Sequence, residues 1–214
     1  MAEYSELLIL GWLVLQLTGS PWQIALVGLS RTTSTFAFSL IAGVIGDQKD
    51  RRSVVMGAQM GSTFVMVGVL IVVTTGIVEP WHLFLSAALR GACRSFEHTC
   101  RRALIFDVVG SRNLLQAVSL DHIGFSSGKI LGPLLIGILL EVTGTAVSAY
   151  AFLTVLHLTS LVTIAMVRPP PLGPMPPRRP VLRSITEGLK FAFSTPPIAA
   201  VLYASVVMNA LFQF

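Results

Sequence analysis

The sequence predicts an all-α integral membrane protein. Of its 214 residues, 53% are hydrophobic and only 12% are charged, whereas an ordinary soluble domain carries about 25% charged residues. Its mean hydropathy is +0.77, and its apolar residues fall into stretches about as long as the roughly 20 residues with which a helix crosses a bilayer. Too few charges remain to cover a water-facing surface, so the composition excludes an ordinary soluble domain.

Six apolar stretches are predicted as the helices of one transmembrane bundle. Residues 7–18 form only half a crossing, and residues 22–46 are interrupted only by Arg31. Residues 53–77 carry no charge at all, whereas residues 82–104 carry several. The predicted helices are 7–18, 22–46, 53–77, 82–104, 114–140 and 146–167.

Two further segments follow the predicted bundle, residues 1–167. Residues 168–196 read as a linker, because seven of the thirteen residues from 168 to 180 are proline and cannot form a helix. A short amphipathic helix at the membrane surface is expected over residues 185–193. Residues 197–214 look like the start of a second transmembrane bundle. Because both ends look like incomplete spans, we expect a chain truncated at both ends, a fragment that lacks the C-terminal half of a transporter.

The basic residues fix the expected orientation. Eleven of them lie on one side of the predicted spans, and the loops of the other side contain none. They are Lys49, Arg51, Arg52, Arg101, Arg102, Arg112, Arg168, Arg178, Arg179, Arg183 and Lys190. By the positive-inside rule these loops and the linker are cytoplasmic, so we predict a multi-pass protein of the bacterial inner membrane.

The net charge of +5 does not indicate a nucleic-acid partner. Such proteins gather basic residues on a solvated face, whereas here they lie between apolar spans. Cys93 and Cys100, seven residues apart on one helix, lie roughly 10 Å apart, beyond disulfide reach. No Cys/His spacing suggests a metal site, and no HExxH, GxSxG or P-loop motif suggests an enzyme. We predict a non-enzyme without metal or cofactor.

The loop after residue 46 resembles the signature loop of the major facilitator superfamily, G-x-x-x-D-[RK]-x-G-[RK]-[RK]. The matching residues are Gly43, Asp47, Arg51 and Arg52. Gln48 and Asp50 depart from it, where a basic residue and a glycine are usual. The resemblance implies a cytoplasmic gate, in which Gly43 allows close helix approach, Asp47 meets a helix N-terminus or an arginine, and the arginines hold the gate.

Two more patterns support this resemblance. Gly128, Gly132, Pro133 and Gly137 are similar to the G-x-x-x-G-P motif of drug/proton antiporters in the same superfamily, which implies tight helix packing. Residues 96–110 look like F-[DE]-x-P-A-R-x-A…[DE]-x-V, the pattern of a subgroup that includes the enterobactin exporter. There Thr99 and Cys100 replace the usual Pro-Ala. The resemblance implies the six-helix N-terminal bundle of a twelve-helix fold and the start of the seventh helix.

Charged residues inside the spans are the candidate proton and substrate path. They are Arg31, Arg90, Arg94, Glu97, His98, Asp121 and Lys129. The spacing of 4, 3 and 4 from Arg90 to Arg101 puts Arg90, Arg94, Glu97 and Arg101 on one helix face. Because a charge facing lipid costs about 2.5–3.5 kcal/mol at mid-helix, this face must meet other helices or a cavity.

Several of these charged residues have two possible roles. The stripe from Arg90 to Arg101 is a transport site or a structural ion-pair ladder, in which Glu97 can pair with Arg94 or Arg101. Arg31 lines a cavity or snorkels to water, and Asp121 carries a proton or forms a salt bridge at the interface. Lys129 is expected to line the cavity. His157 is read mainly as a packing residue.

The leading functional hypothesis is a secondary active transporter that couples protons to the efflux of a small organic compound, of the drug or siderophore type, by alternating access. Its expected partners are the lipid bilayer, protons, the small-molecule substrate and the missing C-terminal half. The alternative is a non-transporting membrane scaffold, or a half-transporter that needs a partner chain. Three basic residues in the expected cavity, Arg90, Arg94 and Lys129, favour an anionic or catecholate-like cargo.

Overall fold

The computed structural model describes residues 2–167. They lie in the first of two compact units into which the chain divides, Met1–Met175 and Pro176–Phe214. The predicted linker over residues 168–196 and the predicted start of a second bundle at 197–214 lie outside the described residues.

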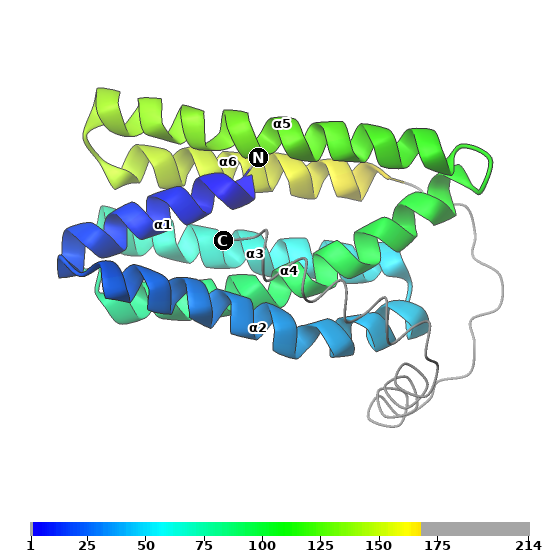
Figure 1. The fold of residues 1–214 in the computed structure, drawn as a ribbon, viewed down its shortest axis with the longest axis horizontal. Coiled ribbons are helices and arrows are strands. Elements are labelled where there is room, and N and C mark those ends of the chain that lie inside the picture. The colour runs from blue at the N-terminus through cyan, green and yellow to red at the C-terminus, as the bar shows by residue number, and fades with distance from the viewer. Residues whose placement is uncertain (1, 168–214) are drawn as a thin grey trace. The chain divides into compact units, whose positions relative to one another are not determined.

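Six α-helices and no strand make up the described part of the chain, as the sequence predicts (Figure 1). They are α1 (Ala2–Thr18), α2 (Pro21–Gln48), α3 (Arg51–Thr74), α4 (Pro80–Val109), α5 (Leu114–Thr143) and α6 (Ala146–Met166). Pro21 and Pro80 occupy the first turns of α2 and α4, where the proline's missing N–H leaves no helical bond unmade.

Several helix ends differ from their predicted positions. Helix α1 begins five residues before position 7, so Glu3 and Glu6 lie inside it. Helix α4 continues from the expected end at 104 to Val109 and stops at Gly110, whose φ of 68° favours glycine. Helix α3 ends at Thr74 rather than at 77. Glu3, Glu6 and Asp107 form ion pairs with arginines of other helices. Composition alone does not reveal such partners.

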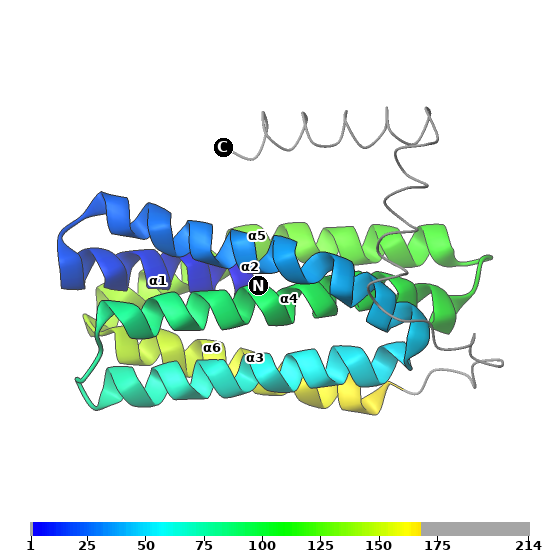
Figure 2. The same cartoon turned by 90° about the horizontal axis from the view of Figure 1, so that it is seen from below.

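The helices run alongside one another (Figures 1 and 2). Helix α4 packs against α2 and α3, α3 also packs against α6, and α1 packs against α5 and α6. The main apolar core joins α1, α4 and α6 through fully buried side chains such as Ile9, Val14, Leu83, Tyr150 and Leu153. This core lies beside the polar site described below.

The outer surface is apolar. Helices α2, α3, α5 and α6 are each long and apolar enough to cross a bilayer, judged by length and composition. Large side chains such as Phe36, Phe64 and Leu115 are 77–81% exposed, which suits lipid and not water. Helix α4 is long but carries the charged stripe, and α1 has 17 described residues. The fold is therefore that of an all-α membrane protein.

Candidate functional site

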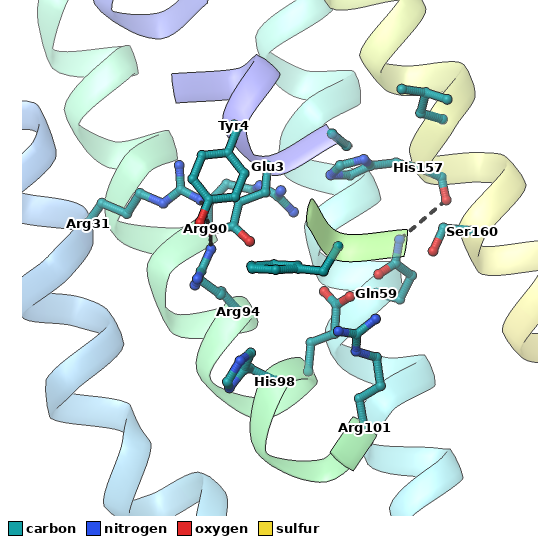
Figure 3. Close-up of a pocket in the computed structure, with 14 residues that line it drawn as sticks. Glu3, Tyr4, Arg31, Gln59, Arg90, Arg94, His98, Arg101, His157 and Ser160 are labelled. Carbon is teal, nitrogen blue, oxygen red and sulfur yellow. Dashed lines mark hydrogen bonds and ion pairs between the residues drawn. The ribbon is translucent and has the colours of Figure 1, made fainter. Parts of the chain in front are cut away.

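A polar cavity of about 280 Å³ lies between the helices, with residues of all six along its wall (Figure 3). Four arginines, two glutamates and two histidines line it. These charged and titratable residues are Glu3, Arg31, Arg90, Arg94, Glu97, His98, Arg101 and His157. Tyr4, Phe125 and Leu156 add an apolar part to the wall.

Helix α4 supplies the largest share of this wall. The four residues of its predicted stripe, Arg90, Arg94, Glu97 and Arg101, all line the cavity, and so does His98. Their helical spacing puts them on one face, and the packing of α4 against its neighbours turns that face inward. The structure thus brings together most of the residues that the sequence selects as a path.

Arg90 is held by Glu6 in the interior of the bundle. Its Nε donates to both carboxylate oxygens of Glu6 at 3.0 Å, and its Nη2 donates to Oε2 at 2.6 Å. Both side chains are at least nine-tenths buried. A paired, hydrogen-bonded guanidinium of this kind joins α1 to α4, and removing either partner would leave an uncompensated charge.

Glu3 lies beside two other arginines. Its Oε1 contacts Nη1 of Arg94 and lies 3.6 Å from Nη2 of Arg31. Arg31 is buried, and its other terminal nitrogen, Nη1, has no hydrogen-bond partner among the described residues. Arg31 therefore lines the cavity and does not snorkel to water.

The salt bridge that the ladder alternative allows between Glu97 and Arg94 or Arg101 is not formed. Arg94 contacts Glu3, and Nη1 of Arg101 lies 3.1 Å from Oδ1 of Asp121 in α5. Glu97 forms no salt bridge with any residue that the structure describes. The sequence places Glu97 within helical reach of both arginines, but acids of other helices are better oriented toward them.

Lys129 lies at the edge of the site and not in its wall. The residue is exposed, and its ammonium lies 5.0 Å from the ring centroids of both Tyr4 and Phe125. These two rings meet edge to face with centroids 5.9 Å apart. Lys129 therefore makes cation–π contacts with both rings. Its ammonium adds a positive charge close to the aromatic part of the wall.

The predicted gate loop ties three helices together. Nη1 of Arg51 donates to both carboxylate oxygens of Asp107 in α4, at 2.8 and 3.0 Å. Nη2 of Arg52 donates to the Ala165 carbonyl in α6 at 2.7 Å. Asp50, which departs from the family pattern, caps α3 by accepting from the Ser53 N–H and hydroxyl at 2.9 and 2.6 Å.

Gly43 and Asp47 do not make the contacts with other described residues that the gate motif implies. A Cβ added to Gly43 would meet no atom within 4 Å, whereas one added to Gly46 would lie 2.8 Å from Sγ of Cys100. The close helix approach therefore belongs to Gly46. Asp47 is exposed near the end of α2, and the following helix is capped by Asp50.

Only two of the three glycines that the antiporter-type motif places in a packed face of α5 are buried. Gly128 and Gly132 are buried, and Pro133 lies inside the helix. Gly137 is exposed, with no atom of the described residues within 4 Å of an added Cβ. Because Gly137 follows Gly132 by five residues, it is turned about 140° away around the helix.

Sequence reasoning missed Glu3 and Glu6, which it placed before the first span, and also Tyr4 and Gln59 of the cavity wall. The available signal was the three-residue spacing of the two glutamates, which puts them on one helix face. Gln59 Nε2 donates to the His157 carbonyl at 3.4 Å. His157 is buried, but its side chain lines the cavity and its Nε2 has no hydrogen-bond partner among the described residues. The described residues offer no cluster of metal-binding side chains.

The sequence matches a family model described as transmembrane secretion effector, and the match covers residues 4–212. The chain belongs to this family of the major facilitator superfamily. It is similar to the enterobactin exporters of Citrobacter koseri and Shigella flexneri, each 27% identical over 86% and 90% of this chain and 44% and 47% of the relative. The exporter of Escherichia coli O1:K1 is 26% identical over 190 residues. The chain spans about half the length of the curated relatives it matches.

Proposed function

We propose that this transmembrane secretion effector forms one half of a secondary active exporter in the bacterial inner membrane. In this proposal it exchanges protons for a small organic compound of the drug or siderophore type. The secretion-effector family and the similarity to enterobactin exporters support export as the activity. The basic loops then face the cytoplasm, as the positive-inside rule requires.

The observation that carries the proposal is the charge of the cavity wall. Four arginines face two glutamates, and Lys129 adds a further positive charge close to the aromatic wall. A volume of about 280 Å³ lies just below the roughly 300–1,000 Å³ typical of small-molecule sites, so it suits a small ligand. Such a wall favours a small anionic substrate, because the arginines would repel a cationic substrate in a medium of low dielectric constant.

Transport requires that the cavity open alternately to the two sides of the membrane. We propose that the six-helix bundle rocks as a unit against a second bundle, supplied by the same polypeptide or by a partner chain. The contacts of Arg51 with Asp107 and of Arg52 with Ala165 tie α3 to α4 and α6. These contacts support movement of the bundle as one body.

Glu97 is the proposed proton carrier. It lines the cavity and has no salt bridge among the described residues, whereas Glu3, Glu6, Asp107 and Asp121 each contact an arginine. A carboxylate that is not committed to an arginine can take up and release a proton without breaking a contact between helices. This makes Glu97 the acid best suited to couple proton movement to substrate movement.

The test is proton-coupled efflux by the complete transporter in everted membrane vesicles. Addition of a transported compound should dissipate an imposed pH gradient, and Glu97→Gln should abolish this response while leaving protein abundance unchanged. Glu141→Gln, a change of an exposed acid at the end of α5, is the matched control. Unchanged pH-dependent efflux with Glu97→Gln would refute the assignment.

A further inference from the structure

Arg31 carries an incompletely compensated charge in the interior of the bundle. Its side chain is only 7% exposed, and its nearest acid, Glu3, is 3.6 Å from Nη2. Nη1 of the same guanidinium is buried and has no hydrogen-bond partner among the described residues. A buried charged donor left without an acceptor is costly, and an anion that reaches it recovers that cost.

Glu3 is a poor counterion for this group. A single oxygen, Oε1, serves both Arg31 and Arg94. The Glu3 side chain lines the cavity and is 26% exposed. The neighbouring Glu6 offers a clear contrast, because both its oxygens accept from Arg90 and both side chains of that pair are buried. Of the two acids of α1, only Glu3 is open to exchange.

We propose that Arg31 and Arg94 form an anion-binding subsite, which Glu3 occupies until the carboxylate of a ligand displaces it. The ligand carboxylate supplies the acceptor that Nη1 of Arg31 lacks, with the planar geometry that suits a guanidinium. Glu3 then turns toward the hydrated part of the cavity. The inference rests on the proposed function and deepens it by naming the group on the substrate that is recognised.

The remainder of the wall indicates the body of the ligand. Tyr4, Phe125 and Leu156 line the same cavity and present aromatic and aliphatic surface. Figure 3 shows Tyr4 and Glu3 on the same side of the cavity as Arg31 and Arg94. A carboxylate on Arg31 therefore leaves an attached ring within reach of apolar side chains, which favours small aromatic carboxylates over inorganic anions.

The experiment measures equilibrium binding of radiolabelled benzoate to the purified chain in detergent, with unlabelled benzamide as the neutral competitor. We expect benzoate to bind and benzamide not to compete. Glu3→Gln removes the internal competitor and should tighten benzoate binding about tenfold or more. Arg31→Lys keeps the charge but loses the planar fork and should weaken binding about tenfold. Glu141→Gln should bind as the unchanged protein does.

Several results would overturn the inference. These are equal competition by benzamide, unchanged or weaker binding with Glu3→Gln, and no benzoate binding by either the unchanged protein or Glu3→Gln at millimolar concentrations. If Glu3→Gln does not yield monodisperse protein, Glu3→Asp, whose shorter side chain draws the carboxylate away from the arginines, should tighten binding by a smaller factor. Binding is measured without transport, so a failure of proton-coupled efflux leaves this result intact, and the reverse also holds.

Discussion

Glu6 and Arg90 form a bidentate ion pair inside the bundle, with three hydrogen bonds of 2.6–3.0 Å. The pair joins the first helix to the fourth at the edge of the polar cavity, because Arg90 also lines that cavity. Its geometry and burial mark it as the fixed part of the charge cluster, while Glu3 and Glu97 are the parts with access to the cavity.

Replacing only one member of this pair should be strongly destabilising. Glu6→Ala leaves the Arg90 guanidinium buried without its counterion, and we expect a loss of about 3–5 kcal/mol. Thermal unfolding of the purified protein in detergent measures the effect. The double variant Glu6→Leu with Arg90→Met should recover most of the lost stability, and a double variant as unstable as Glu6→Ala would contradict a role as a charge pair.

Helices α2 and α4 cross in direct contact at Gly91. A Cβ at this position would collide with the Arg31 carbonyl oxygen and would lie 3.1 Å from Cβ of Ser34. Thr35 Oγ1 donates to the carbonyls of both Arg31 and Gly91 at 3.0 and 3.1 Å. The crossing therefore positions Arg31 beside the arginines of α4.

Gly91→Ala should separate these helices and destabilise the protein by about 1–3 kcal/mol. The matched control is Gly57→Ala in α3, where an added Cβ meets nothing within 4 Å. That change should be neutral or stabilising, because alanine favours a helix by about 1 kcal/mol over glycine. Equal thermal unfolding midpoints for the two variants would show that close contact at Gly91 is not required.

The contact of Arg51 with Asp107 should be measurable as an energetic coupling. Asp107 is 9% exposed and Arg51 is 28% exposed, so solvent screens the pair only in part. A double-mutant cycle with Arg51→Gln and Asp107→Asn should give a coupling of about 1 kcal/mol, near the upper end for such pairs. Additive effects of the two changes on unfolding would indicate that the loop is held by other contacts.

The cap of α3 predicts a pH dependence. Hydrogen bonds from the Ser53 side chain and backbone hold the pKa of Asp50 below its ordinary value. The stabilisation is therefore complete above the unfolded-state pKa of about 3.9, and it is lost as the pH falls through the lower pKa of the folded state.

Asp50→Ala should accordingly cost about 1 kcal/mol near neutral pH. The difference in unfolding midpoint between this variant and the unchanged protein should shrink as the pH falls below about 4. Ser53→Ala, which removes one of the two donors to Asp50, should show a smaller difference with the same trend. A difference that stays constant into the acid range would contradict the cap.

The helices and the inward stripe of α4 were predictable, because hydrophobic length and the 3.6-residue period are properties of one segment at a time. The ion-pair partners were not predictable in this way. Whether Arg94 contacts Glu97 on its own helix or Glu3 on another depends on which helices are neighbours. The same holds for glycine, since close contact belongs to Gly91 and Gly46 and not to Gly43.

The acids of α1 also bear on how this protein enters the membrane. Helix α4 carries its arginines on one face, and an isolated helix with such a face enters lipid at a cost of about 2.5–3.5 kcal/mol for each central charge. Glu6 and Glu3 neutralise Arg90 and Arg94. Because α1 precedes α4 in the chain, we expect the insertion of α4 during biogenesis to depend on the earlier placement of α1.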